Sequence, residues 1–409
     1  MVSAIITIGD ELLIGQVIDT NSAWIAQQLN LIGVKVEERV SVADDKAAIE
    51  NTITRLLKSV DYIFITGGLG PTKDDITKHT LCSYFEDELV MHQPTLENIT
   101  RLFKLFGKDV NNINAQQAML PSRAKIVANN NGTAAGMWFQ KNGKSIISMP
   151  GVPFEMKGMM TEFILPEIQQ LNNITIYHKT ICTQGIGESW LAEKIADIES
   201  ALPSYIKLAY LPAPGLVRLR LSCYNHTSDK ELGEWVDKIV ERVGVHVYGF
   251  NNDTLPYVVG KLLKEKSKTL AVAESCTGGY ISHLITSIPG SSSYYKGGVV
   301  SYANEVKVNS LGVSANSIYA EGAVSKEVVE QMAIGVLKKM DSDYAIATSG
   351  VAGPDGGSIE KPVGLVWIAI ASKEGIFSKD FKFGDNRERN IERAALTALS
   401  FLRKELIKK

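Results

Sequence analysis

Short apolar runs alternate with amphipathic stretches through the first 170 residues of the chain. Strands are expected at residues 4–8, 34–40 and 62–66, where the apolar runs are rich in β-branched residues. Helices are expected at residues 21–29 and 46–58, where apolar positions lie three or four apart. A further strand is expected at 145–149, followed by a helix over 154–164 that Pro166 helps to close. This alternation predicts a parallel sheet with helices on both faces.

The order of elements changes between about residues 174 and 247. A strand-like run (175–183), a helix, two strands, a second helix and a last strand indicate a small α+β module, which ends in a polar turn at 249–254. Strands and helices alternate again after that turn, with strands expected at 269–273, 297–302, 344–348 and 364–371. The pattern thus predicts two α/β domains with mostly parallel sheets, joined by a small α+β module, over residues 1–171, 172–250 and 254–409.

Composition adds limits to this picture. The 409 residues include 43 Lys+Arg and 45 Asp+Glu, and the formal net charge of −2 gives no global positive field for a dedicated nucleic-acid or membrane-surface binder. The apolar amino terminus lacks basic residues and runs into Asp10 and Glu11, so it is read as a buried strand and not a signal peptide. No apolar run reaches the ~20 residues that span a bilayer.

The four cysteines are scattered along the chain without a CxxC pair, and the six histidines are equally dispersed. Such spacing suits neither a disulfide framework nor a zinc cluster, so any metal would be held by oxygen ligands. We therefore expect a cytoplasmic protein without a membrane partner.

Three motifs near the carboxyl terminus gather polar and small residues at the ends of expected strands. The run AVAESCTGG (271–279) is the first, and in an open α/β sheet the loops after the strands bind ligands. Its candidate substrate-binding residues are Glu274, Ser275, Thr277, Gly278 and Gly279. The alternative is that Ser275 or Thr277 only caps a helix and the glycines permit close packing.

The second motif, around the strand expected at 297–302, contains Ser292, Tyr302 and Lys307. A serine nucleophile needs a base, and a desolvated lysine serves where no histidine is near. The third motif, TSGVAGPDGG (348–357), is a loop of small residues that lets backbone N–H groups approach a ligand, with Gly350 and Gly353 as candidates.

These motifs, with GAVSKEVV between the second and the third and KPVGLVW after the third, closely resemble the nicotinamide mononucleotide amidohydrolase domain of the CinA family. The resemblance implies hydrolysis of the substrate carboxamide to the acid with release of ammonia, and no cofactor. It implies Ser292 as the nucleophile, Lys307 and Tyr302 as its partners, and Asn304 in the substrate site. The family's GDR segment appears here as GDNR, with one extra residue, so Arg387 is given no role.

Carboxylates and glycines also gather after the strands expected in the first domain, in GDELLIG (9–15), TGGLGPTKDDIT (66–77) and PGVPFEM (150–156). No GxxxxGKS is present, which argues against a P-loop nucleotidase. With NGTAAG at 131–136, these motifs resemble the molybdopterin-binding fold of MoaB and MogA proteins, in the version that begins CinA proteins. The aspartate that functions in that fold corresponds to Asp75.

That resemblance implies divalent-metal-dependent hydrolysis of ADP-ribose to AMP and ribose 5-phosphate. A pyrophosphate needs N–H donors and a carboxylate-held cation such as Mg²⁺. Gly67, Gly68 and Gly70 are the candidate donors, and the candidate metal ligands are Glu11, Asp75 and Glu155.

The middle module resembles the K-homology-like insert of CinA proteins, but its glycine stretch GIGES (185–189) has an acid and no lysine, so RNA binding is not expected. We expect a homodimer with two activities on small nucleotides, nicotinamide mononucleotide and ADP-ribose. Two alternatives remain: an amidase whose first domain only senses nucleotides, and a molybdopterin-binding or adenylating protein.

Overall fold

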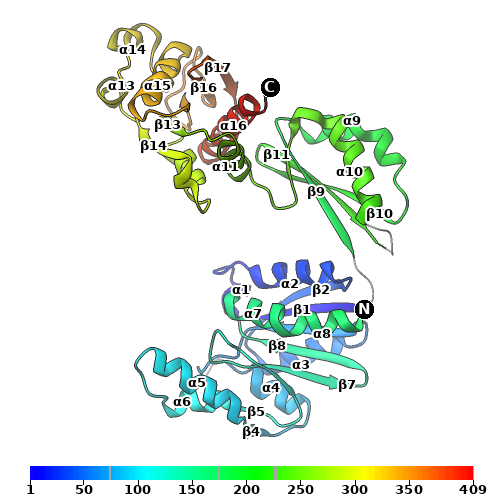
Figure 1. Cartoon of the computed structure of the whole chain (residues 1–409). Helices are drawn as coiled ribbons and strands as arrows, with labels where there is room; N and C mark the ends of the chain where they lie inside the picture. The colour runs from blue at the N-terminus through cyan, green and yellow to red at the C-terminus, as the bar shows by residue number, and fades with distance from the viewer. Residues whose placement is uncertain (73–74, 173–175, 225–228, 409) are drawn as a thin grey trace. The chain divides into compact units, whose positions relative to one another are not determined.

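The computed structural model describes residues 1–72, 75–172, 176–224 and 229–408, which form two compact units (Figure 1). The first unit is Met1–Tyr177, and the second consists of His178–Cys223 together with residues 229–408. Both units combine helices with β-sheets, so the predicted α/β class with a smaller α+β module is confirmed.

The first unit is built on a six-stranded sheet in the order β2-β1-β3-β8-β7-β6. Pairing is parallel from β2 to β8 and antiparallel from β8 to β6, so the sheet is mixed. Its strands are β1 (Val2–Ile8), β2 (Lys35–Val42), β3 (Tyr62–Thr66), β6 (Lys125–Val127), β7 (Gly136–Lys141) and β8 (Lys144–Met149).

Helices cover both faces of this sheet. Successive residues of a buried strand point to opposite faces, and Ile6 of β1 belongs to one core cluster while Ile5 belongs to the other. The remaining elements of the unit are α1 (Asp10–Leu13), α2 (Thr20–Leu31), α3 (Lys46–Leu56), α4 (Thr77–Tyr84), α5 (Gln93–Leu105), α6 (Asn112–Ala115), η1 (Gln116–Ala118), α7 (Pro153–Met159), η2 (Met160–Ile164), α8 (Leu165–Leu171), and the strand pair β4 (Leu89–Met91) and β5 (Met119–Pro121).

Pro166 does not end the helical run as expected. The chain continues from α7 through the π-helical turn η2 into α8, and Pro166 lies in the first turn of α8. A π-turn opens the hydrogen-bond ladder, and a proline in a first helical turn has no ladder bond to lose. The prediction that this proline closes the segment was therefore wrong.

The α+β module opens the second unit with a four-stranded sheet in the order β10-β11-β9-β12. Residue 175 of the expected first strand lies outside the described residues. The elements of the module are β9 (Tyr177–Gln184), α9 (Glu188–Ser200), β10 (Ile206–Ala213), β11 (Leu216–Cys223), α10 (Asp229–Val243), η3 (Gly244–His246) and β12 (Val247–Phe250).

The rest of the second unit surrounds a five-stranded sheet in the order β14-β13-β15-β16-β17. The pairs of β13 with β14 and with β15 are parallel, and β15, β16 and β17 pair antiparallel. The strands are β13 (Leu270–Glu274), β14 (Tyr295–Val300), β15 (Tyr344–Gly350), β16 (Leu365–Ser372) and β17 (Gly375–Lys382). The helices are α11 (Leu255–Glu265), α12 (Tyr280–Thr286), η4 (Ser291–Ser293), α13 (Asn304–Leu311), α14 (Ala315–Glu321), α15 (Lys326–Lys339) and α16 (Arg387–Ile407).

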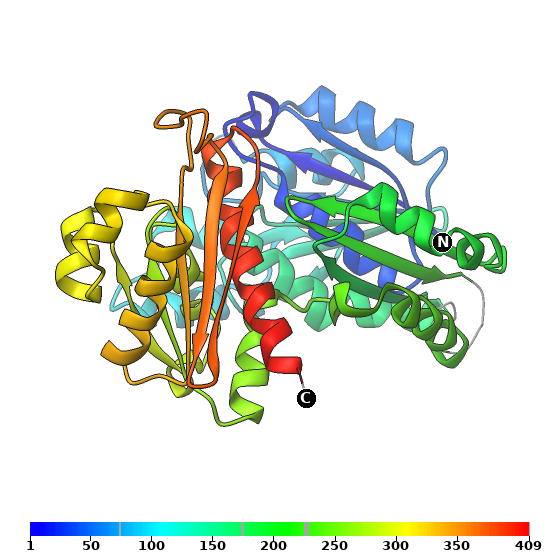
Figure 2. The same ribbon diagram turned by 90° about the horizontal axis from the view of Figure 1, so that it is seen from above.

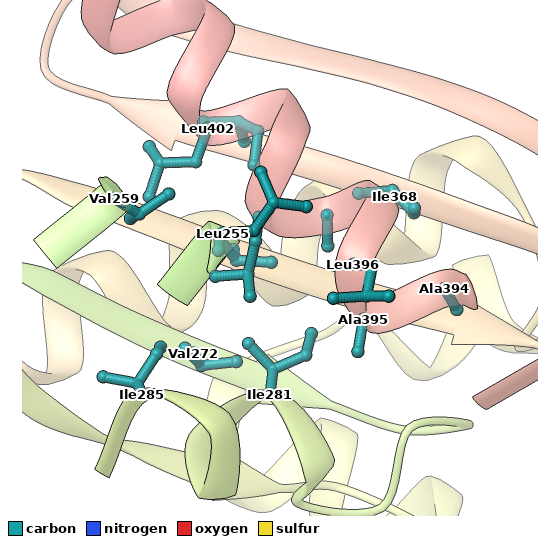
Figure 3. Close-up of a cluster of buried hydrophobic side chains, with 14 of the residues drawn as sticks. Leu255, Val259, Val272, Ile281, Ile285, Ile368, Ala394, Ala395, Leu396 and Leu402 are labelled. Atoms are coloured by element: carbon teal, nitrogen blue, oxygen red, sulfur yellow. The ribbon is translucent and has the colours of Figure 1, made fainter. Parts of the chain in front are cut away.

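Figure 2 shows α15 on one side of this sheet and α16 on the other. Leu255 and Val259 of α11 meet Leu402 of α16 in the core drawn in Figure 3. Cys182 and Tyr248 of the α+β module belong to the same cluster, so the module and the last sheet share one hydrophobic core. Among the described helices, none has both the length and the apolar character needed to cross a bilayer.

A close approach of two helices generates a stability prediction. A side chain at Gly335 in α15 would overlap the carbonyl oxygen of Leu311 at the end of α13, so we expect Gly335→Ala to lower the free energy of unfolding by about 1–3 kcal/mol. The same change at Gly233, in α10, meets only the flexible end of Lys179 and should raise it by up to about 1 kcal/mol. Urea unfolding followed by circular dichroism measures both variants, and equal shifts would contradict the close packing.

Candidate functional site

Three strand ends meet at one edge of the last sheet. In the parallel register Glu274 of β13 lies beside Val300 of β14 and Thr348 of β15, so the loops that follow these strands start side by side. The backbone binds them together, since the Ser275 N–H donates to the Thr348 carbonyl at 3.0 Å. The predicted AESCTGG, YANEVK and SGVAGP motifs therefore come together at this edge, which we call the carboxyl edge.

Lys307 is buried at the carboxyl edge. The side chain is 1% exposed, and its Nζ donates hydrogen bonds to the carbonyl oxygens of Ser301 at 2.7 Å and Tyr302 at 3.3 Å. Burial disfavours the charged ammonium and lowers the pKa of Lys307 from its usual value. The desolvated lysine predicted for this position is thus present in the structure.

Ser292 does not lie with Lys307. It is exposed in the turn η4, which precedes β14, whereas Tyr302 and Lys307 follow that strand. A strand of six residues spans about 20 Å at ~3.3 Å per residue, so Ser292 lies at the opposite edge of the sheet. The prediction that Ser292, Tyr302 and Lys307 form one constellation within a chain was wrong.

Ser275 is the hydroxyl of the predicted set that remains free at the carboxyl edge. Its side chain is 9% exposed, and its Oγ makes no hydrogen bond to the described residues. Both neighbours of Ser275 in the sequence are linked to Lys307. On one side, the Glu274 carbonyl accepts a hydrogen bond from the Ser301 N–H, and the Ser301 carbonyl accepts one from the Lys307 Nζ. On the other side, the charge of Lys307 acts on the Cys276 thiol. Burial raises the pKa of that thiol to about 12, which leaves it an inert neighbour.

The side chains of two predicted substrate-binding residues form hydrogen bonds within the protein. The Glu274 carboxylate is fully buried and accepts the N–H groups of Gly279, Ile281 and Ser282 and the Ser282 hydroxyl at 2.7–3.0 Å. The Thr277 hydroxyl bonds that of Thr348 at 2.8 Å. Both residues therefore shape the turn before α12, and the prediction that they bind substrate was wrong for their side chains.

The predicted glycines supply shape and access at this edge. Gly278 and Gly279 have positive φ values of 59° and 99°, which the sharp turn after Ser275 requires. Gly350 ends β15 and Gly353 lies in the loop that follows, and a side chain at Gly350 would press on the backbone of β16. Asn304 begins α13 as an exposed residue near Lys307 in sequence.

Arg387 is the functional candidate that sequence reasoning left without a role. Its guanidinium donates to the Gly353 carbonyl at 2.7 Å and to the Tyr302 hydroxyl at 3.0 Å. The Tyr302 side chain is 62% exposed and is held by Arg387, while its carbonyl holds Lys307. Tyr302 orients the lysine through the backbone, and no bond between its hydroxyl and Lys307 is present among the described residues, as a proton relay would need.

A second group of predicted residues lines a cavity of about 450 Å³ in the first unit. The cavity lies at the ends of β1, β3 and β8, where the three motifs of that domain follow their strands. All of the predicted residues line it: Glu11, Gly67, Gly68, Gly70, Asp75 and Glu155. Their predicted gathering at one site is thus found in the structure, although Asp74 of the same motif lies outside the described residues.

Each predicted carboxylate of this cavity rests against a different glycine. A side chain at Gly70 would displace the carboxylate of Asp75, and one at Gly132 would displace that of Glu155. Asp75 also accepts the Thr72 N–H at 2.9 Å and hydroxyl at 2.6 Å, and Glu155 accepts the Asn129 amide at 2.7 Å. The carboxylates are held on separate segments of the chain, so the glycines are needed for their positions as well as for ligand access.

The three carboxylates do not form a ready-made metal centre. Among the residues that the structure describes, no three His, Cys, Asp or Glu side chains gather closely enough to hold a metal ion. The predicted metal centre of Glu11, Asp75 and Glu155 is thus corrected to three carboxylates that line a shared cavity without forming a closed ligand set. Mg²⁺ is often held by one or two carboxylates together with substrate phosphates, and this arrangement fits a cation that enters with a phosphorylated ligand.

Two further residues of this cavity were missed. Gln117 lines it at 5% exposure, and neither its amide nitrogen nor its amide oxygen has a hydrogen-bond partner among the described residues. Asp44 also lines it. Burial raises the pKa of its carboxyl, and the negative charges of Asp10, Glu11 and Asp75 raise it further. Neither residue belongs to a glycine motif, so nothing in the sequence marked them.

Comparisons with known proteins match the chain in three consecutive parts. Residues 4–170 match the model described as a probable molybdopterin binding domain, 178–249 the damage-inducible protein CinA KH domain, and 252–406 the CinA C-terminal domain. A crystal structure of competence/damage inducible protein CihA from Agrobacterium tumefaciens is 36% identical over 38% of this chain and 94% of that chain, with a TM-score of 0.37.

Curated relatives match the whole chain. A CinA-like protein of Flavobacterium psychrophilum is 48% identical over 414 residues, which cover 100% of this chain and 99% of the relative. A CinA-like protein of Cytophaga hutchinsonii is 45% identical over 406 residues, 98% of this chain and 97% of the relative. Sequence identity of this extent, over nearly the full length of this chain and of each relative, places the chain in the CinA family, with a molybdopterin-binding-like domain at its amino terminus.

Proposed function

We propose that the last domain is an amidohydrolase that converts nicotinamide mononucleotide to the corresponding acid and ammonia. The observation that carries this proposal is that the carboxyl edge holds both the buried Lys307 and a free serine hydroxyl, that of Ser275. Nucleophilic serine with a desolvated lysine as its base is an established solution for acyl transfer. The electron-poor pyridinium ring of the substrate makes its carboxamide a better electrophile.

The bonding of Lys307 supports its role as a base. A neutral amine has two hydrogens and one lone pair, and two carbonyl oxygens, of Ser301 and Tyr302, accept from Nζ. The lone pair is then left to take the proton of the Ser275 hydroxyl as its Oγ attacks the carboxamide carbon. The resulting ammonium passes the proton to the departing ammonia, and water, deprotonated by the same amine, releases the acid and restores Ser275.

The position of Arg387 fits binding of the substrate phosphate. Its guanidinium lies at the exposed rim of the carboxyl edge, between Tyr302 and Gly353. Arg presents several donors in a planar fork that suits phosphate oxygens. A mononucleotide with its carboxamide at Ser275 would direct its phosphate toward this rim.

Three substitutions test the assignment. We expect Ser275→Ala and Lys307→Met each to reduce ammonia release from nicotinamide mononucleotide by at least about 10³-fold, because they remove the attacking group and its base. Ser292→Ala is the matched control and should retain wild-type activity, since it lies at the other edge of the sheet. Ammonia release by the purified proteins gives the answer, and activity that depends on Ser292 but not on Ser275 would overturn the assignment.

The rate should depend on pH in a defined direction. Burial lowers the pKa of Lys307 below its usual value of 10.5, and only the neutral amine accepts a proton. We therefore expect kcat/KM for deamidation to rise as the pH rises through this lowered pKa, and to level off above it. A profile that is flat between mildly acid and alkaline pH, measured under conditions where the protein stays folded, would exclude lysine as the base.

We propose in addition that the first domain hydrolyses ADP-ribose to AMP and ribose 5-phosphate with a divalent cation. The specific support is the cavity that combines the Gly67–Gly68 backbone and carboxylates with the unpaired amide of Gln117. The cation would offset charge on the pyrophosphate, and Asp75 and Glu155 would orient it. The Gly67 N–H already donates to the Met149 carbonyl at 3.1 Å, so the N–H groups of Gly68 and Gly70 would meet phosphate oxygens. The Gln117 amide offers a donor and an acceptor side by side, as adenine requires.

Asp75→Asn tests this second activity. The change removes the negative charge of one candidate metal ligand but keeps an oxygen that accepts hydrogen bonds from Thr72. AMP release should therefore fall by about tenfold or more while the domain stays folded. Asp109→Asn, at an exposed residue outside the cavity, is the matched control and should behave as wild type. Chelator should act like Asp75→Asn on AMP release and leave ammonia release unchanged. A wild-type protein that binds ADP-ribose without releasing AMP would instead favour a nucleotide sensor.

A further inference from the structure

A larger open cavity lies elsewhere in the second unit, away from the carboxyl edge. Its volume is about 620 Å³, within the ~300–1,000 Å³ usual for small-molecule sites. The loop before α9 and the turn between β10 and β11 form one wall, and β17 and α16 form the other. None of the residues of the two candidate sites described above lines it.

The walls of this cavity are strongly cationic. Four basic side chains line it and only one acid, Glu188, does so; the basic residues are Lys379, Lys382, Arg393 and Lys404. None of the four forms a hydrogen bond or an ion pair with the part of the chain that the structure describes. Burial lowers the pKa of Lys404, and the positive charges of Arg403 and Lys379 lower it further, as expected where basic groups are crowded.

A buried polar group without a partner also faces this cavity. Ser400 of α16 is 2% exposed, lines the cavity, and has no hydrogen-bond partner for its Oγ. A helical serine usually donates to a carbonyl one turn back, and leaving a buried hydroxyl unpaired is unfavourable. A ligand that fills the cavity would supply the missing partner.

Aromatic rings lie next to the basic groups. The rings of Phe381 and Phe383 are nearly parallel, with centroids 6.0 Å apart, and both line the cavity. The guanidinium of Arg393 lies 5.1 Å from the centroid of the Phe383 ring, and Lys379 lies 5.7 Å from that of Phe381. The wall thus offers flat apolar surface for a ring beside cations for an anion.

We propose that this cavity binds a nucleoside phosphate. The basic side chains would hold the phosphate, the Ser400 hydroxyl would bond one of its oxygens, and the phenylalanine wall would pack against the base. Helix α9 begins at the cavity without a side-chain cap, so its first N–H groups add to the attraction for an anion. Glu188 opposes a longer polyanion here, and the chain as a whole carries a net charge of −2, which favours a small nucleotide over RNA.

Binding of adenosine 5′-monophosphate to the full-length protein tests the proposal. We expect the double variant Lys382→Gln/Arg393→Gln to bind one AMP fewer than wild type in calorimetric titrations, or the same number with at least about tenfold weaker affinity at one site. The matched control, Lys338→Gln/Lys339→Gln on the exposed end of α15, removes the same charge and should bind like wild type. Ser400→Ala should weaken the same site several-fold.

The other ligands separate the possible outcomes. Adenosine and inorganic phosphate should each bind this site at least about tenfold more weakly than AMP, because each lacks half of the contacts. Ammonia release without added AMP should be unchanged in both double variants, so failure of the proposed amidase would leave this test intact. Equal AMP binding by wild type and Lys382→Gln/Arg393→Gln would overturn the proposal, as would equal binding of phosphate alone or tighter binding of a single-stranded oligonucleotide through the same residues.

Discussion

Burial of one lysine sets the chemistry of the carboxyl edge. Taking an ammonium out of water is costly, and Lys307 recovers part of that cost by donating to two backbone carbonyls. Those carbonyls belong to Ser301 and Tyr302, which directly follow β14, so the position of the amine is fixed by the sheet itself. Strand pairing then fixes the position of Ser275, which directly follows the neighbouring β13. The placement of Ser275 and Lys307 at one edge thus depends on strand register more than on any contact between the two side chains.

The same register explains which part of the site the sequence could predict. Strand β3 was expected at its observed bounds, and β1 at 4–8 against Val2–Ile8, because both are buried runs rich in Ile and Thr. The edge to which a residue belongs follows from whether it precedes or follows its strand. Ser292 precedes β14 and Lys307 follows it, so their separation could have been inferred from the strand expected at 297–302. What sequence could not give is that the Thr277 and Glu274 side chains turn inward, since this depends on the tight turn before α12.

In the first domain the glycine motifs marked the cavity correctly but not its chemistry. Glycines at strand ends are readable in sequence, because positive φ and close approach both require them; Gly67 and Gly68 have φ values of 115° and 66°. The distance between carboxylates on three separate segments, α1, the loop before α4 and α7, is a property of tertiary structure. For the same reason Gln117, which follows the short helix α6, could be assigned to the cavity only from the folded chain.

Helix α16 shows why a balanced composition does not exclude a local charge site. Its apolar stripe includes several alanines, such as Ala394 and Ala398, whose small side chains let the helix pack closely on the sheet but give a weak hydrophobic signal in sequence. The same helix carries Arg393 and Lys404 on the side that faces the α+β module. These charges meet those of β17 because α16 packs against that strand, with Phe401 against Phe381, and the α+β module supplies the other wall of the cavity. A net charge of −2 is therefore compatible with a cationic cavity, because the fold concentrates basic residues that are scattered in the sequence.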